Sequence, residues 1–358
     1  MITKETITLN GTQYNRSTLD KLHFTNEPED SWQNSIYHFL QNWFDESDFI
    51  LAQTSGSTGK PKNIKLSKLS MENSARMTNQ FFGLKAESTA LLCLPASYIA
   101  GKMMLVRALS AGFNLITVEP VSNPFEMLNV PIDFTAITPY QLFHSVQSLR
   151  TKSVHQIIVG GSAVTGKLEQ LSENIPAELY ETYGMTETSS HIALRRFNGN
   201  NKSDNFTILD GINIRQDERG CLIISAPHLL ETEIQTNDMV ELKNEKSFRW
   251  LGRVDSVINS GGIKIHPEQV EKKLEGIIPY SYFITSLPDE LLENKVVLVL
   301  ESEPYNVQQK VNLKIQMENI LNKYEMPKQI FYLPFFKYST SNKVLRKETL
   351  AEVLKKSS

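Results

Sequence analysis

The chain has 358 residues, of which 40% are hydrophobic and 22% charged, as is usual for a globular protein. At roughly 150 residues per domain, this length suggests two domains. The formal net charge of -3 gives no positive field that would attract nucleic acid. The N-terminus is too polar for a secretory signal, and no apolar run is long enough to span a membrane. We therefore expect a cytoplasmic protein with no nucleic-acid partner and no membrane span.

The two cysteines, Cys93 and Cys221, are far apart and lie within apolar stretches. Neither belongs to a metal-binding or redox spacing, so both are expected to be small core residues.

The N-terminal part of the chain predicts a hairpin, a helix and a strand. Residues 5–20 indicate two short strands around Asn10-Gly11. Asp30 or Ser31 can cap a helix whose apolar side chains share one face. These side chains are Ile36, Phe39, Leu40, Trp43 and Phe44. Residues 48–52 then predict a short buried strand.

Further along, short apolar runs alternate with helical or turn segments. The predicted strands are 91–94, 115–118, 134–137 and 157–159, and a predicted helix at 103–111 ends at Gly112. This alternation indicates an α/β fold with largely buried sheets. Past residue 205 strands become frequent, and a compact α+β unit follows from about residue 254. We predict a large N-terminal domain, 1–253, and a small C-terminal domain, 254–358.

The unit at 254–358 has its own predicted element order. Helices are expected at 267–274, 307–324 and 347–356, and strands at 282–286, 296–300 and 330–333.

A loop rich in glycine, serine and threonine, TSGSTGKPK at 54–62, follows the strand at 48–52. Its glycines let the backbone approach a ligand closely, and its hydroxyl and N–H groups can surround a polyphosphate. A Walker A loop has Gly where Thr54 stands and Ser or Thr where Pro61 stands, so this loop is of another kind. The alternative is a flexible linker. The expected phosphate contacts are Thr54, Ser55, Gly56, Ser57, Thr58, Gly59 and Lys60.

Three other stretches combine residues of chemical interest. In YETYGMTET, 180–188, Tyr183 could stack on a base and Glu187 could hold Mg²⁺; the alternative is a polar turn. Residues 251–271 pair an Arg and an Asp with a Gly-Gly turn and a proline-started helix; the alternative is a plain loop. In residues 339–346, Lys343 follows small polar residues; the alternative is a solvated surface lysine.

In this order, the four stretches resemble the adenylate-forming superfamily of acyl-CoA synthetases, from about Phe49 to the C-terminus. The resemblance implies a large α/β domain with an abbreviated N-terminus and a small mobile C-terminal α+β lid. It also implies an ATP-dependent acid–CoA ligase that works through an acyl-adenylate. ATP, Mg²⁺ and CoA would be its cofactor and co-substrates, with a small carboxylic acid as substrate.

The resemblance implies a role for each motif residue. Lys343 would bridge the carboxylate and the α-phosphate, Glu187 would hold Mg²⁺, and Thr186 would act beside it. Asp238, in Thr236-Asn237-Asp238, would bind the ribose. The other implied residues are Gly161, Ser162, Ala163, Thr182, Tyr183, Gly184, Met185 and Arg253 at the nucleotide, Asp255 at the hinge, and Gly261 and Gly262 at the CoA tunnel.

Two segments depart from the family pattern. The P-x-x-H segment has Tyr98 in place of His, so a role copied from that His does not carry over. The terminal Ser-Gly-Lys reads Ser341-Asn342-Lys343, and Asn tolerates the left-handed conformation that the turn needs.

Within the superfamily, the compact length and the segments PASYIAGKMM and SSHIALRR look most like short o-succinylbenzoate–CoA ligases of menaquinone biosynthesis. The alternatives are another aryl- or acyl-CoA ligase, or a stand-alone adenylation domain that loads a carrier protein. An ATP-binding regulator without catalysis would be expected to lack Lys343 or Glu187, and both are present.

A second carboxylate on the acid would need a buried cation, because burying it unpaired is costly. Lys102, Arg107, Arg195 and Arg196 lie in the segments concerned. We rank Arg195 first, because on a helix it would share a face with His191 and because Arg suits bidentate carboxylate binding. Lys102 is second, His191 is expected to assist, and Tyr98 lies in the same region.

Overall fold

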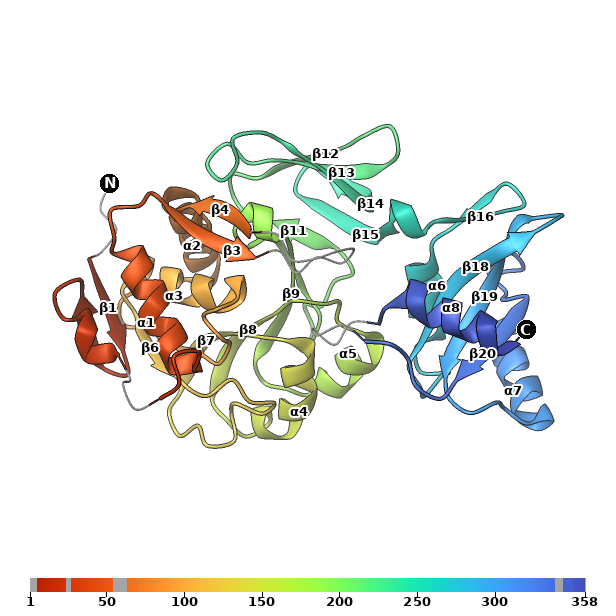
Figure 1. Ribbon diagram of the computed structural model, residues 1–358, viewed down its shortest axis with the longest axis horizontal. Helices are drawn as coiled ribbons and strands as arrows, with labels where there is room; N and C mark the ends of the chain where they lie inside the picture. Colours follow the sequence, from red (N-terminus) through yellow and green to blue (C-terminus); the bar gives the residue numbers. More distant parts are fainter. Residues whose placement is uncertain (1–4, 24–26, 54–62, 339–343, 358) are drawn as a thin grey trace.

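Most of the chain forms one large sheet flanked by helices, and a smaller sheet lies toward the C-terminus (Figure 1). The computed structural model describes residues 5–23, 27–53, 63–338 and 344–357. Within these ranges the large sheet has 13 strands and the smaller one has five. No helix in the described part of the chain is long and apolar enough to cross a membrane.

The large sheet has a parallel centre. In order across the sheet its strands are β12 (Asn213–Gln216), β13 (Cys221–Ser225), β14 (Ile234–Asn244), β15 (Ser247–Arg253), β11 (Phe206–Ile208), β10 (His191–Arg196), β9 (Glu178–Gly184), β8 (Val154–Val159), β7 (Ile132–Ile137), β5 (Thr89–Leu92), β6 (Asn114–Thr117), β1 (Thr6–Leu9) and β2 (Thr12–Asn15). From β1 to β9 neighbouring strands pair in parallel, and the other pairs are antiparallel. The carboxyl ends of the parallel strands therefore meet at one edge, where such sheets bind ligands.

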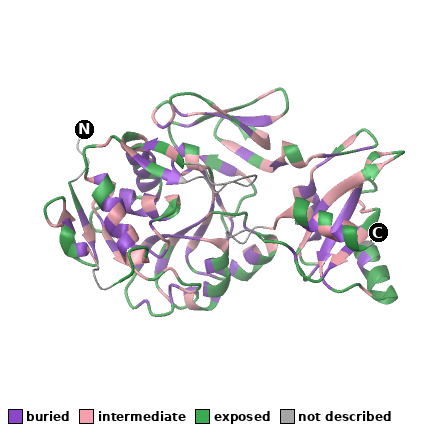
Figure 2. Ribbon diagram, viewed as in Figure 1, coloured by how far each residue is buried: buried purple, intermediate pink, exposed green. Residues whose placement is uncertain are grey.

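Helices cover both faces of the large sheet. Along β5, Ala90 and Leu92 pack with α1 (Trp32–Trp43), α2 (Lys68–Phe82) and α3 (Ile99–Ala111). Leu91 and Cys93 pack on the other side with α4 (Pro139–Leu149) and α5 (Gly166–Ser172). This division follows from the alternation of side chains along a strand. Figure 2 shows the buried residues between these layers.

Several predicted elements are confirmed. The N-terminal hairpin pairs β1 with β2 around Asn10-Gly11, and the Ser31 side chain caps α1. Helix α3 ends at Gly112, whose φ of 80° is the left-handed region that glycine tolerates. Cys93 and Cys221 are both buried.

The strand predicted at 48–52 is present, and it is buried on one face only. Strand β3 (Phe49–Gln53) pairs with β4 (Asn63–Ser67) in a separate antiparallel two-stranded sheet. One face of this sheet is open, so Leu51 is 55% exposed while Ile50 and Ala52 are buried. The predicted strand is therefore confirmed, but it is half-buried and lies outside the large sheet.

The smaller sheet is built from the C-terminal residues. Its strands are β17 (Ile263–Ile265), β16 (Ile258–Ser260), β19 (Glu293–Glu301), β18 (Tyr282–Asp289) and β20 (Gln329–Leu333), with helices α6 (Pro267–Leu274), α7 (Val307–Glu318) and α8 (Arg346–Ser357). Helix α7 is shorter than predicted, because the Asn322 side chain accepts from the N–H groups of Tyr324 and Glu325 and forms a turn. Since β15 ends at Arg253 and β16 begins at Ile258, we propose that the two sheets mark two domains, 1–253 and 254–358.

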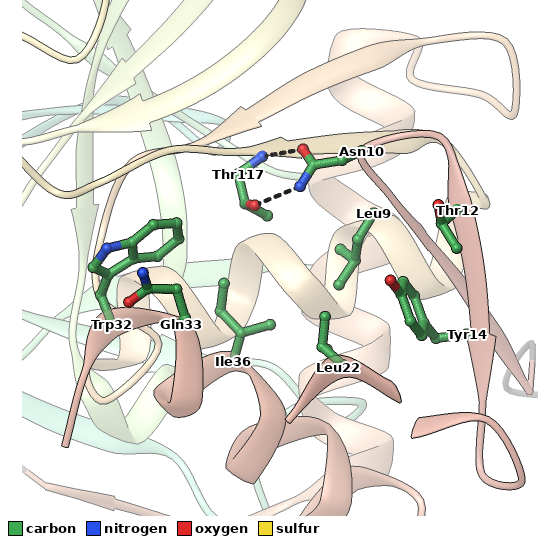
Figure 3. A pocket seen from close by; sticks show the side chains of 9 residues that line it. All are labelled: Leu9, Asn10, Thr12, Tyr14, Leu22, Trp32, Gln33, Ile36 and Thr117. Atoms are coloured by element: carbon green, nitrogen blue, oxygen red, sulfur yellow. Dashed lines mark hydrogen bonds between the residues drawn. The ribbon is translucent and has the colours of Figure 1, made fainter. Parts of the chain in front are cut away.

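A small cavity of about 110 Å³ lies between the N-terminal hairpin and α1 (Figure 3). The Asn10 side chain lies at its edge and is held by the hydroxyl and N–H of Thr117. None of the nine residues that line this cavity is a predicted site residue.

Candidate active site

Two predicted nucleotide-binding segments meet at the carboxyl ends of β8 and β9. The Thr182 hydroxyl donates to the Val159 carbonyl over 3.3 Å, which joins the two strand ends. Gly160 is required here, because a Cβ at this position would lie 2.4 Å from Thr182 Oγ1. The segment 161–163 that follows is exposed, and Gly161 has a φ of 93°. The exposed turn after β8 thus lies beside the end of β9.

A second cluster joins Tyr183 on β9 to Asp238 on β14. The Tyr183 hydroxyl donates to Asp238 Oδ2 over 2.8 Å, and Trp250 Nε1 lies 3.4 Å from Asp238 Oδ1. Burial raises the pKa of the Tyr183 hydroxyl, and the Asp238 carboxylate raises it further. The edge of the Tyr183 ring packs against Phe248. The aromatic residue and the carboxylate predicted to hold the base and the ribose are therefore in direct contact.

The predicted hinge residues adjoin this cluster. Asp238 faces Arg253 across β14 and β15, with 3.9 Å between Arg253 Nη1 and Asp238 Oδ1. Arg253 also donates to Asp255 over 3.1 Å, and Asp255 lies in the short helix η3 (Val254–Ser256) between the two sheets. The structure thus brings Arg253 and Asp255 to the nucleotide cluster, at the junction of the two proposed domains.

Glu187 lies in η2 (Thr186–Thr188), directly after β9, and is exposed. Its carboxylate has no ion-pair or hydrogen-bond partner among the described residues. No group of three His, Cys, Asp or Glu side chains suited to a metal occurs in the described ranges. The role of Glu187 in binding Mg²⁺ stays a prediction. Its exposed carboxylate is compatible with that role, and Thr186 lies beside Glu187 in the chain.

The turn between η2 and β10 is tightly built. A Cβ on Gly184 would lie 2.4 Å from the Ser190 carbonyl oxygen and 2.5 Å from His191 Cα. Ser189 has a φ of 63°, an uncommon conformation for a residue with a side chain. Such conformations persist where the surrounding structure holds them and are concentrated at functional sites. This strained turn was not foreseen from the sequence.

The phosphate-loop residues Thr54, Ser55, Gly56, Ser57, Thr58, Gly59 and Lys60 lie outside the described residues, as does Lys343. Their predicted roles stay predictions. The described strands β3 and β4 border the loop on both sides.

The first-ranked cation, Arg195, is already engaged by two carboxylates. Residues 191–196 form strand β10, so the helical face expected for His191 and Arg195 was wrong. A β-bulge between His191 and Ala193 interrupts the alternation of side chains along β10. His191 contacts Thr78 on α2, whereas Arg195 contacts Glu169 on α5. Arg195 Nη2 lies 2.6 Å from both Glu169 Oε1 and Glu181 Oε2, and its side chain is only 7% exposed. Its guanidinium is thereby occupied.

The second-ranked cation, Lys102, contacts backbone oxygens. Its ammonium group donates to the carbonyls of Leu51, 3.2 Å away, and Ser97, 3.3 Å away. Burial lowers its pKa. Tyr98, at the N-cap of α3, is 68% exposed. Lys102 therefore ties α3 to β3, and it has no carboxylate partner among the described residues.

The residue that stands out is Arg107, which the sequence analysis named but did not rank. It lies on α3, is 1% exposed, and has no ion-pair partner in the described part of the chain. Its Nη2 donates to Ser190 Oγ over 2.8 Å and its Nη1 to Met104 Sδ over 3.5 Å, while Nε is buried without a partner among the described residues. Burial lowers its pKa to about 9, which still leaves it charged at neutral pH. Arg196, the remaining candidate, binds Glu178 over 2.7 Å.

The Gly261-Gly262 turn joins β16 to β17. The two glycines have φ values of 58° and 80°, and Ser260 pairs with Ile263 across the turn. The Gly261 N–H donates to the Leu292 carbonyl over 2.8 Å. A Cβ on Gly262 would find no atom within 4 Å, so this glycine faces open space.

Comparisons with known proteins agree with these features. The family model described as AMP-binding enzyme matches residues 4–210. The chain is 25% identical to 2-succinylbenzoate–CoA ligase of Enterococcus faecalis, over 96% of this chain and 78% of that protein. It is 24% identical to the ligase of the same name from Lactococcus lactis, over 85% of this chain and 71% of that protein.

Acyl-CoA synthetases are also found among the solved structures that resemble this chain. An acyl-CoA synthetase (AMP-forming)/AMP-acid ligase II-like protein of Dyadobacter fermentans superposes with a TM-score of 0.61 at 32% identity, covering 95% of this chain and 99% of that one. The o-succinylbenzoate coenzyme A synthetase of Bacillus subtilis, in complex with ATP and magnesium, has a TM-score of 0.71 at 22% identity, covering 84% and 69%. Because the family model spans more than half of its residues, the chain belongs to the AMP-binding enzyme family, and it is an adenylate-forming acid–CoA ligase.

Proposed function

We propose that the acid activated by this enzyme is o-succinylbenzoate, an aromatic acid with two carboxylates. The observation that carries the proposal is the buried guanidinium of Arg107, which has no carboxylate partner among the described residues. A buried charge without a partner is costly, so its presence favours a ligand that supplies the opposite charge. The names of the relatives support the same acid, although their identity to this chain is low.

The reaction would have two half-reactions at one carbonyl carbon. The acid carboxylate attacks the α-phosphorus of ATP, which forms acyl-AMP and releases pyrophosphate. The CoA thiol then attacks the acyl carbonyl, loses its proton, and displaces AMP. Both steps bring anionic groups together, so the site must offset negative charge.

This chain's own residues would serve these steps in different ways. Tyr183 and Asp238 would hold the adenosine, and Lys343 with the 54–60 loop would neutralise the phosphates. Mg²⁺, when bound, would offset phosphate charge next to the Glu187 carboxylate. Lys343 would have to withdraw before the thiol could approach, and the small domain would turn about Asp255 so that Gly261 and Gly262 line the thiol's path.

The experiment is an ATP–pyrophosphate exchange screen with o-succinylbenzoate, 4-oxo-4-phenylbutanoate, benzoate and a long-chain fatty acid. Mass spectrometry would then detect the CoA thioester. We expect o-succinylbenzoate to give the highest kcat/KM. Preference for a monoacid would identify another acyl-CoA ligase, and exchange without CoA consumption would indicate loading of a carrier protein. No exchange with any of these four acids would overturn o-succinylbenzoate as the substrate.

The same assay tests Arg107 directly. Arg107→Leu should lower kcat/KM for o-succinylbenzoate. The loss should correspond to an increase of roughly 2–5 kcal/mol in the activation free energy. The penalty for 4-oxo-4-phenylbutanoate, which lacks the ring carboxylate, should be far smaller. If the variant treats both acids alike, Arg107 does not bind the second carboxylate.

A further inference from the structure

Arg107 is part of a continuous chain of buried and partly buried hydrogen bonds. Arg107 Nη2 donates to Ser190 Oγ over 2.8 Å, and Ser190 Oγ lies 3.3 Å from His191 Nδ1. On the other side of the ring, His191 Nε2 lies 3.3 Å from Thr78 Oγ1. The Thr78 hydroxyl lies 3.1 Å from the Ser74 carbonyl oxygen. The chain thus links α3, β10 and α2.

When the His191 ring is neutral, only one arrangement of protons satisfies all of these contacts. The Ser74 carbonyl can only accept, so the single Thr78 hydroxyl proton is donated to it. His191 must therefore donate to Thr78 through Nε2–H. A neutral ring with its proton on Nε2 accepts at Nδ1, so the Ser190 hydroxyl must donate to His191.

The state of His191 agrees with this reasoning. The residue is 5% exposed. Burial lowers the pKa of His191 well below its usual value, and the charge on Arg107 lowers it further. The ring is therefore neutral at physiological pH and has one donor and one acceptor nitrogen, as the chain requires.

Unsatisfied polar atoms gather around the chain. Four buried polar side-chain atoms without a partner among the described residues belong to it or adjoin it. They are Ser74 Oγ, Asn79 Oδ1, Arg107 Nε and Ser189 Oγ. Asn79 is tied to the region because its amide donates to the Arg107 carbonyl over 3.1 Å. Buried polar atoms are nearly always hydrogen-bonded in folded proteins, so such a concentration indicates a place for a polar ligand group or water.

We propose that His191, held as the Nε2–H tautomer by Thr78, is a positioning residue for acid specificity. Through Ser190 it holds the Arg107 guanidinium so that Nε–H remains available to the second carboxylate of the acid. The proposal rests on the proposed function for the identity of that acid, while the direction of the hydrogen bonds is independent of it.

The first test reads the tautomer without any substrate. Nitrogen NMR of the full-length protein labelled with ¹⁵N-histidine, with His191→Gln for assignment, should show His191 neutral with its proton on Nε2 at pH 7 and above. Thr78→Val removes the acceptor and should change the His191 signals. A proton on Nδ1, or protonation of the ring near pH 6, would overturn the proposal whatever acid the enzyme uses.

The second test uses a matched pair of substitutions at His191. The Asn side chain can place an oxygen where Nδ1 stood and keep the acceptor for Ser190, whereas Gln reaches the Nε2 position and loses that acceptor. We expect His191→Gln and Ser190→Ala to reduce kcat/KM for o-succinylbenzoate about tenfold or more, mostly through KM. His191→Asn should retain most of the wild-type kcat/KM for o-succinylbenzoate.

The internal control is turnover of 4-oxo-4-phenylbutanoate by the same variants. A variant that merely unfolds would lose both acids equally, and its thermal unfolding midpoint would fall. Equal losses for the two acids in well-folded variants, or equal behaviour of His191→Asn and His191→Gln, would overturn the positioning role. If the wild-type enzyme rejects o-succinylbenzoate while the tautomer is as described, the proposed function fails and the hydrogen-bond chain stands.

Discussion

Arg195 holds two carboxylates together, and this predicts a structural effect of its removal. The Glu181 side chain is only 10% exposed, and its Oε1 also accepts the Val164 N–H over 2.8 Å. Without the guanidinium, Glu181 would stay buried with no cation. We expect Arg195→Ala to lower the free energy of unfolding by about 3–5 kcal/mol, measured by urea denaturation.

The matched control is the neighbouring Arg196. Its partner Glu178 is 36% exposed, so Arg196→Ala should cost about 1 kcal/mol or less. Adding Glu181→Gln to Arg195→Ala should restore part of the lost stability, because the stranded charge is removed. If Arg195→Ala is as stable as the wild type and loses only the turnover of the diacid, Arg195 binds the second carboxylate as predicted from the sequence.

Glu271 provides a prediction of pH dependence. Its oxygens accept from the Ile284 N–H and from Arg346 Nη2, but burial raises the pKa of Glu271 from 4.5 to about 6. A raised folded-state pKa stabilises the fold below the unfolded value near 4.5, and this stability is lost as pH rises through 6. The gap corresponds to about 2 kcal/mol.

We therefore compare the free energy of unfolding of the wild type with that of Glu271→Gln. The advantage of the wild type should fall by about 2 kcal/mol between pH 4 and pH 7. Denaturant unfolding of both proteins at each pH measures this difference. Substitution of the exposed Glu290 by Gln serves as the control. A difference that stays constant with pH, or that grows, would contradict the raised pKa.

At this scale the sequence identified the cations but not their pairing. Arg107, Arg195 and Arg196 were all visible as arginines in or beside apolar segments. Which one lacks a carboxylate depends on Glu169, Glu178 and Glu181, which lie on other elements. Ion pairing between elements is set by tertiary packing, so residue type and spacing could not show which of the three is paired with a carboxylate.

At the scale of one element, the Gly261-Gly262 turn carries the next prediction. Two successive positive φ values define a two-residue hairpin turn that disfavours most side chains. Gly262 is proposed to line the path of the CoA thiol. A Leu side chain there would fill this path, so Gly262→Leu should spare pyrophosphate release and block thioester formation. Pyrophosphate release and CoA thioester would be measured separately. Normal CoA turnover in this variant would contradict the assignment.

Gly262→Asn separates bulk from backbone strain. Asn tolerates the left-handed conformation better than Leu, and a Cβ at this position meets no atom in this structure. The Asn variant should therefore unfold close to the wild type and form thioester faster than the Leu variant. Equal loss in both would point to strain in the turn as the cause.

Elements with local signals were predicted well, and those set by distant pairing were not. Helix α6 (Pro267–Leu274) has the predicted bounds, because Pro267 favours a helix start and its apolar residues recur at helical spacing. Strand β3 was recognised, but its pairing with β4 across the 54–62 loop was not. The ranking of Arg195 used helical spacing for His191 and Arg195, and the structure has strand β10 there.

At the scale of the whole molecule, the two sheets are held in one relative orientation by contacts from α6. Gln269 Nε2 donates to the Leu251 carbonyl over 2.9 Å, and the Gly166 N–H donates to Glu275 Oε2 over 2.5 Å. Lys272 reaches Asp204 over 3.0 Å, but both side chains are more than half exposed, so this pair contributes little. The sequence suggested two domains and a hinge; it carried no signal for these contacts, which depend on the orientation adopted.

In this orientation a Cβ on Gly262 would meet no atom of the described residues within 4 Å. We propose that this is the adenylating orientation and that the α6 contacts favour it. Removing the Glu275 carboxylate would leave the Gly166 N–H unsatisfied and weaken this orientation by about 1 kcal/mol. That change corresponds to about fivefold in the ratio of the two orientations.

We therefore expect Glu275→Ala to slow adenylation up to about fivefold, while thioester formation from supplied acyl-adenylate and CoA does not slow. Burial raises the pKa of Glu275, so both half-reactions should be followed at pH 8, which favours the ionised carboxylate of the wild type. Glu318→Ala is the matched control, because Glu318 lies on α7 and pairs only within its own helix, with Lys314, in the described structure. Lys343→Ala gives the largest adenylation defect for comparison, since it should abolish adenylation and spare thioester formation. If Glu275→Ala slows both half-reactions equally, or neither, the α6 contacts do not set the orientation that adenylation uses.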